Sequence, residues 1–176
     1  MRIVLIHHTR VDLPHGICYG WTDVPLASSF PEEAAATKAA LSVYGPFDKV
    51  FTSPLTRARR LADYCGYPDA EADDRLKELN MGDWEMQRYD EITDPYLQRW
   101  YDDYLHLPTP GGESFPMQMA RVADFLDGVR QSPYIQVAVF AHAGVLVASS
   151  IYAGLFPVED AWHHITEYGG ILELNL

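Results

Sequence analysis

The sequence has few cysteines, few basic residues and no long hydrophobic run, and each shortage argues against a class of protein. Only Cys18 and Cys65 occur in 176 residues, which is too few for a disulfide framework and favours two buried, reduced thiols. Thirteen lysines and arginines stand against 25 acidic residues, so the formal charge is −12. Nucleic acids and anionic membranes need a basic surface, and neither is expected as a partner.

Short hydrophobic runs also argue against export and membrane insertion. Residues 1–6 are too few for the core of a signal peptide, and no apolar run approaches the length of a membrane span. We therefore expect a soluble, cytoplasmic protein. The composition is that of an ordinary globular chain, with 48% hydrophobic residues, and the length suits one domain over residues 1–176.

Predicted strands and helices alternate along the chain. Strands are predicted at residues 2–6, 49–52, 69–75, 135–141 and 171–176. Helices are predicted at residues 30–44, 53–65, 88–92, 94–105, 114–131 and 145–153. The run 135–141 is apolar almost throughout, as in a central strand covered on both faces. This pattern predicts an α/β fold with a largely parallel sheet.

Three polar clusters directly follow predicted strands. They are His7-His8-Thr9-Arg10, Ser53-Pro54-Leu55-Thr56-Arg57 and His142-Ala143-Gly144. The carboxyl ends of parallel strands share one edge of a sheet, where ligands bind in open α/β folds. Arg57 lies in the first turn of its predicted helix, where backbone N–H groups favour an anion. Each residue alone has a structural explanation, but together they predict a phosphate site.

Five stretches in order carry a family resemblance: LIHHTRV, TSPLTRARRLA, LKELNMGDWEM, GGES and VFAHAGVL. They resemble the motifs of the histidine phosphatase superfamily, also called phosphoglycerate mutase-like, over residues 2 to about 174. The resemblance implies a three-layer fold with a largely parallel central sheet and helices on both faces. It also implies a metal-independent phosphomonoesterase that needs no cofactor and acts on a small phosphorylated metabolite.

Within the superfamily, residues 18–26, 81–86 and 161–165 resemble the alpha-ribazole phosphatases. Those enzymes remove the 5′-phosphate of alpha-ribazole 5′-phosphate during assembly of the nucleotide loop of cobalamin. A broad-specificity small-metabolite phosphatase is the alternative. The sequence leaves the oligomeric state open, with a homodimer among the alternatives.

The resemblance implies four catalytic residues. His8 is the nucleophile that forms a phosphohistidine, and Arg57 and a protonated His142 stabilise the phosphoryl oxygens. Glu78 is the general acid, and must hold a proton for the leaving oxygen. Nearby Leu79, Met81 and Trp84 are expected to desolvate it.

Further residues are expected at the phosphate or substrate by the same resemblance. Thr9 replaces a family glycine and offers a hydroxyl, Glu113 matches a recurrent family glutamate, and His163 lies in the alpha-ribazole-like stretch. Core packing is expected for Tyr19, Trp21, Trp84 and Trp162, with stacking on a substrate ring as the alternative.

His7 departs from the family, which has an arginine before the nucleophile. A histidine lacks the bidentate guanidinium and is positive only when protonated. Loss of one such donor can cost about 10²–10³ in rate. Three explanations stay open: Arg10 restores the charge, His7 acts as a protonated donor with an acid-shifted optimum, or activity is impaired. We favour retained phosphatase chemistry with weaker phosphate binding.

Two other classes compete with this interpretation. A metallohydrolase would use His7, His8, His142 and His163, but Arg57 would repel the cation and no zinc-binding spacing occurs. A degenerate protein would bind phosphorylated metabolites without turnover. Within the same chemistry, a mutase is disfavoured because the chain is short.

Overall fold

The computed structural model describes all residues from Met1 to Leu176. Its sheet has the strand order β3-β2-β4-β1-β5. The strands are β1 (Arg2–His7), β2 (Lys49–Thr52), β3 (Glu71–Ala72), β4 (Gln136–Ala141) and β5 (Ile171–Asn175). All neighbours are parallel except β5, which runs antiparallel to β1. The prediction of a largely parallel α/β sheet is confirmed.

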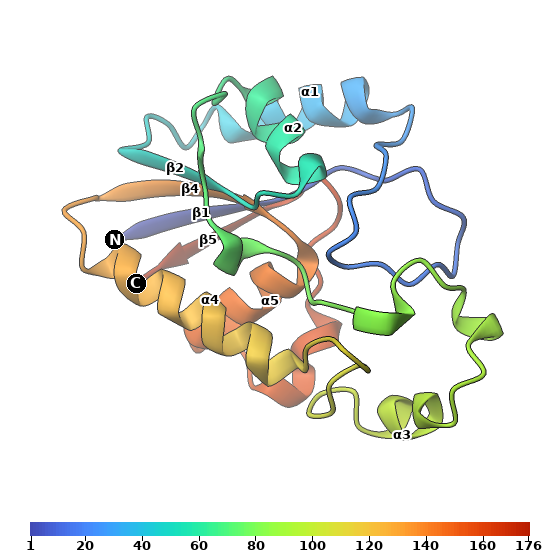
Figure 1. The fold of residues 1–176 in the computed structure, drawn as a ribbon. Coiled ribbons are helices and arrows are strands. Elements are labelled where there is room, and N and C mark those ends of the chain that lie inside the picture. Colours follow the sequence, from blue (N-terminus) through green and yellow to red (C-terminus); the bar gives the residue numbers. More distant parts are fainter.

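Helices cover both faces of the sheet, as Figure 1 shows. On one side lie α1 (Phe30–Leu41) and α2 (Thr56–Cys65), and on the other α4 (Phe115–Arg130) and α5 (Ala143–Tyr152). Residues of β1 alternate between two apolar cores. Val4 and Ile6 belong to the core that includes α1 and α2, and Ile3 and Leu5 to the core that includes α4 and α5. No helix is both long and apolar enough to cross a membrane.

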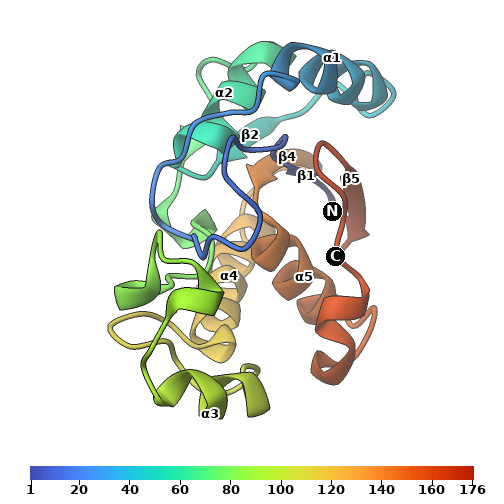
Figure 2. The ribbon, with the colours of Figure 1, turned by 90° about the vertical axis from the view of Figure 1, so that its right-hand side faces the viewer.

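The long loops lie beyond the carboxyl ends of the parallel strands. Figure 2 looks onto this edge, where α3 (Tyr96–Asp102) stands away from the sheet. A separate apolar cluster of Cys18, Met81 and Trp84 packs here against aromatic residues that include Trp100. Four short 3-10 helices complete the structure: Asp74–Leu76, Gly82–Trp84, Tyr89–Glu91 and Val158–His163.

Local sequence signals locate several element ends correctly. The Ser114 side chain caps α4 by accepting a hydrogen bond from the Met117 N–H. Gly66 ends α2 in the left-handed conformation, with φ of 103°. Cys18 and Cys65 are both buried free thiols.

Other predicted boundaries are wrong, and two of the differences bear on the site. The helix predicted from Ser53 begins at Thr56, after an extended Leu55 at the N-cap position. The Ser53 hydroxyl instead makes a hydrogen bond with a side chain from a distant strand end. The helix predicted from Val145 begins at Ala143. The first long helix ends at Leu41 rather than residue 44. The short strand expected within residues 69–75 is present as β3.

Candidate active site

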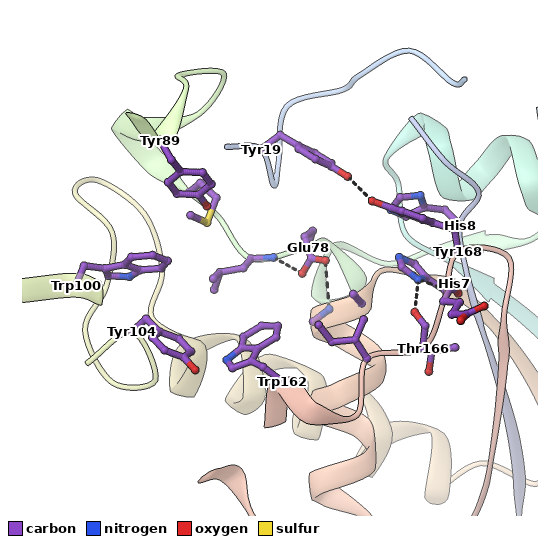
Figure 3. Close-up of a pocket in the computed structure, with 16 residues that line it drawn as sticks. His7, His8, Tyr19, Glu78, Tyr89, Trp100, Tyr104, Trp162, Thr166 and Tyr168 are labelled. Carbon is purple, nitrogen blue, oxygen red and sulfur yellow. Dashed lines mark hydrogen bonds between the residues drawn. The ribbon is translucent and has the colours of Figure 1, made fainter. Parts of the chain in front are cut away.

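A pocket of about 510 Å³ opens where β1 and β4 end. Sixteen residues line it, and ten of them are hydrophobic. Its two ends differ, as Figure 3 shows: His7 and His8 lie at one end, aromatic rings form the other, and Glu78 lies between them. The aromatic residues at that far end are Tyr89, Trp100, Tyr104 and Trp162. The pocket therefore joins a polar end to a broad apolar wall.

His8 directly follows β1 and is almost completely buried. Its Nδ1–H donates to the Thr9 carbonyl at 2.6 Å, so Nε2 is the nitrogen that carries the lone pair. Nε2 accepts a hydrogen bond from Nε of Arg57 at 3.3 Å. Burial, together with the neighbouring His7 ring and the charge of Arg57, holds the pKa of His8 well below its usual value. His8 is therefore a neutral imidazole with a fixed tautomer.

Arg57 occupies the first turn of α2 and is fully buried. Two main-chain carbonyls orient its guanidinium: Nη2 donates to Gly20 at 2.5 Å and Nη1 to Thr22 at 3.1 Å. The Tyr19 ring lies 5.4 Å from the guanidinium carbon. The loop after β1 thus places a permanent positive charge beside Nε2 of His8.

His142 caps α5 at the end of β4 and has no exposed surface. Its Nε2 is hydrogen-bonded to the Ser53 hydroxyl at 2.8 Å, and its ring centre lies 5.1 Å from that of His8. Burial, and then the charge of Arg57, hold the pKa of His142 well below its usual value. The imidazolium that the resemblance implies therefore needs the negative charge of a bound phosphate.

Glu78 lies against the first turn of α5. Its Oε2 accepts from the Gly144 N–H at 3.2 Å, and its Oε1 accepts from Nε2 of Gln118 at 2.9 Å and from the Leu79 N–H at 2.8 Å. Both carboxyl oxygens are thus held by donors while the side chain lines the pocket. A carboxyl group is fixed between the two histidines and the aromatic wall (Figure 3).

His7 is the last residue of β1, and its ring lies 4.7 Å from that of His8. Its Nδ1–H donates to the carbonyl of Thr166 at 2.8 Å, with that of Glu167 at 3.2 Å. The Tyr168 ring stacks on the imidazole at 4.9 Å. Neighbouring strand residues normally face opposite ways, and the two histidines share the pocket because the strand ends between them.

A family model for the histidine phosphatase superfamily (branch 1) matches residues 3–176. The chain belongs to this superfamily. The adenosylcobalamin/alpha-ribazole phosphatase of Salmonella typhimurium is 27% identical to it over 177 residues, covering 96% of this chain and 87% of that protein. A 2,3-bisphosphoglycerate-dependent phosphoglycerate mutase of Methylobacterium sp. (strain 4-46) is 36% identical over 165 residues, covering 81% and 77%.

The fold comparison agrees with the family. The crystal structure of the alpha-ribazole phosphatase from Shigella flexneri matches this histidine phosphatase superfamily member with a TM-score of 0.88 at 26% identity. The match covers 100% of this chain and 91% of that one. The phosphoglycerate mutase-like fold implied by the motifs is thereby confirmed.

Not every residue expected at the site of this superfamily member reaches the pocket. Arg10 is exposed and paired with Glu33, at 3.0 Å between Nη1 and Oε1. His163 is exposed at the end of a 3-10 helix, and its neighbour Trp162 lines the pocket in its place. Thr9 is buried, and its hydroxyl has no hydrogen-bond partner.

Glu113 lies outside the pocket lining and is ion-paired with Arg121 through both carboxyl oxygens, at 2.9 Å each. The Arg121 guanidinium in turn donates to the main-chain carbonyls of Arg75, Lys77 and Glu78. Glu113 therefore supports the segment that carries Glu78 instead of contacting a ligand directly.

The expectation of core packing holds for Trp84, which is buried, and for Trp162 in part, since it packs against the core that includes α4 and α5. Tyr19 and Trp162 line the pocket. Trp21 is partly exposed, and its indole N–H donates to the Glu78 carbonyl at 2.6 Å. Loops bring these rings to the pocket, and loop paths leave no periodic signal in a sequence.

Sequence reasoning missed Gln118, Tyr168 and Glu85. Gln118 had a detectable signal, because it is a polar residue on the apolar stripe of α4 with Phe115, three residues earlier. Tyr168 and Glu85 lie in loops, and their partners are distant in sequence.

The metallohydrolase alternative would use His7, His8 and His142, with His163 as a further candidate. His7, His8 and His142 do cluster, but His163 is exposed at the end of a 3-10 helix and does not join them. No group of three or more histidine, cysteine, aspartate or glutamate side chains has an arrangement that would hold a metal ion.

Proposed function

We propose that this superfamily member hydrolyses phosphomonoesters through a phosphohistidine at His8, without a metal ion. The supporting observation is the geometry of His8. Its Nδ1–H is committed to the Thr9 carbonyl, so Nε2 carries the lone pair beside the Arg57 guanidinium. A neutral, aimed nitrogen next to a fixed cation is what attack on a phosphoryl group requires.

The reaction has two balanced steps. First, Nε2 of His8 forms a bond to phosphorus, the ester P–O bond breaks, and Glu78 gives a proton to the leaving oxygen. Then water attacks phosphorus, the P–N bond breaks, and Glu78 accepts the proton from water. Arg57 stabilises the phosphoryl oxygens in both steps. His142 does the same once it has gained a proton on binding of the phosphate.

The substrate we propose is alpha-ribazole 5′-phosphate. Two of the relatives described above are named alpha-ribazole phosphatases. The aromatic wall of the pocket suits a leaving group with a flat heterocycle, since Trp and Tyr rings stack on such groups. A wall of this kind has few polar groups that could hydrogen-bond to substituents on the ring and so distinguish one aromatic ester from another. A broad-specificity phosphatase for aromatic phosphomonoesters is therefore the second candidate.

The test is phosphate release from alpha-ribazole 5′-phosphate and from sugar, nucleoside and aryl phosphates, with chelator present. Wild-type protein should release phosphate, and His8→Ala should reduce the rate at least 10³-fold because the nucleophile is gone. Replacement of the exposed His15, as His15→Gln, should change nothing. Equal rates on every aromatic ester would favour the second candidate. Turnover that survives in His8→Ala, or that chelator abolishes, would refute the mechanism.

A further inference from the structure

The two edges of the His7 ring face different surroundings. On one edge, the carbonyls of Thr166 and Glu167 lie 2.8 and 3.2 Å from Nδ1. Carbonyl oxygens only accept hydrogen bonds, so Nδ1 carries a hydrogen in both charge states of the ring. The stacked Tyr168 ring holds the same orientation, and a flipped ring would exchange Nδ1 for a carbon and lose both contacts.

The other edge of the ring faces the pocket beside His8 (Figure 3). Nε2 makes no hydrogen bond there. In neutral His7 this atom presents a lone pair, which repels the oxygens of a phosphate. In protonated His7 it presents an N–H, which donates to them. An arginine at this position would donate in either case, because it is always charged.

The surroundings of His7 keep the ring neutral until an anion arrives. Burial lowers its pKa, and the buried Arg57 charge acts in the same direction. The Thr166 and Glu167 carbonyls and the Glu78 carboxylate act in the opposite direction and only partly offset these effects. His8, His142 and Tyr168 also face this region, and none of them supplies a positive charge in the neutral site.

We propose that His7 binds the phosphoryl group only as an imidazolium, so that each dianion entering the site takes up one proton at Nε2 of His7. This inference depends on the proposed function, since it assigns that site to phosphate. It replaces the constant charge of the family arginine with a charge that the ligand itself induces. The proton on His7 should then by itself raise affinity for a dianion up to about tenfold for each unit by which pH falls, in addition to any proton that His142 takes up.

Sulfate is the probe, because it stays a dianion from pH 6 to pH 8 and so contributes no titration of its own. Calorimetric titration in buffers of different ionisation enthalpy gives the number of protons taken up per sulfate bound. The proteins compared are the wild type, His7→Arg, His7→Gln and His15→Gln. The two replacements at His7 differ in size, so a folding defect in one leaves the other informative.

The wild type should take up about one proton more per sulfate than either His7 variant. At pH 8, His7→Arg should bind sulfate at least tenfold more tightly than the wild type, and His15→Gln should match the wild type. The ¹⁵N signal of His7 Nε2 at pH 7 should change from the unprotonated to the protonated range when sulfate is added.

Equal proton uptake by the wild type and both His7 variants would overturn the inference, because His142 or Glu78 would then be the group that takes the proton. In that case the proposed function would still stand if His8→Ala abolished turnover. Failure of every variant to bind either sulfate or inorganic phosphate would overturn both proposals.

Discussion

Gly144 shows how closely the general acid is packed. A β-carbon added at this position would overlap Oε1 of Glu78 and would lie 2.7–2.8 Å from the side-chain amide of Gln118. The contact is this close because the Gly144 N–H donates to Oε2 of the same carboxyl group. Hydrogen at the α-carbon is therefore what allows Glu78 to rest on the first turn of α5.

Gly144→Ala should lower kcat/KM by about 10², because a shift of about 1 Å in the general acid misaligns proton transfer. The control is Gly128→Ala in α4, where an added β-carbon meets nothing within 4 Å. That control should keep full activity and gain about 0.5–1 kcal/mol of stability. Steady-state kinetics and urea unfolding of both variants provide the check. Unchanged kcat/KM in Gly144→Ala would show that Glu78 is not positioned by this turn.

Residue identities reveal chemistry from sequence most directly when the partner is local or when the residue belongs to a family motif. His8 was identified because a strand end and its motif are contiguous, and Ser114 because a cap acts within three residues. Arg10 is expected at the phosphate because its positive charge suits an anion, and Glu113 because it matches a recurrent family glutamate. Their ion-pair partners, Glu33 and Arg121, are 23 and 8 residues away, and only the folded chain shows them.

At the scale of elements, the loop over residues 20–22 is the most consequential feature around the site. One half-buried carboxylate, that of Glu85, accepts hydrogen bonds from the N–H groups of Gly20, Trp21 and Thr22 and from the Thr22 hydroxyl. Although burial alone would raise the pKa of Glu85, these donors lower it below the usual value. The same loop turns its carbonyls of Gly20 and Thr22 toward Arg57.

Glu85 therefore positions Arg57 without contacting a ligand. Glu85→Ala should leave several loop N–H groups without a partner, reduce stability by about 1–3 kcal/mol and weaken sulfate binding at least tenfold. Glu85→Gln, which keeps the size and one acceptor oxygen, should recover part of both losses. Asp90→Asn removes an exposed pair with Arg88, and should leave both stability and sulfate affinity close to those of the wild type. Unaltered sulfate affinity in a folded Glu85→Ala protein would contradict the positioning role.

Elements with a regular period were the predictable part of this fold, and the loops were not. The strand over β4 was evident because it is apolar almost throughout, and α4 because of its cap and apolar stripe. The pocket wall depends on loops whose contacts join residues 19 and 168 or 22 and 85. Such pairings leave no periodic trace, so the aromatic wall emerged only from the structure.

At the scale of the whole molecule, burial of neutral histidines in an acidic protein gives stability two opposing dependences on pH. The formal charge of −12 becomes less negative as pH falls, which reduces self-repulsion and favours the folded state. His8 and His142 act in the opposite direction. Their pKa values lie well below the usual 6.5 in the fold, chiefly because of burial, while in the unfolded chain they take up protons near 6.5.

The sign of the histidine contribution follows from this difference. Above pH 6.5 both states are neutral at His142, and below it the unfolded state binds one more proton. As pH falls below 6.5, the free energy of unfolding should therefore decrease by up to about 1.4 kcal/mol per pH unit for each such histidine. Urea unfolding between pH 7.5 and 5.5 should show a steeper decline of the free energy of unfolding for the wild type than for His142→Gln. The difference in slope should correspond to about one more proton bound on unfolding. His15→Gln, which removes an exposed histidine, should match the wild-type slope. Equal slopes for the wild type and His142→Gln would mean that His142 is charged in the folded protein, and the phosphate site would then carry a second permanent cation beside Arg57.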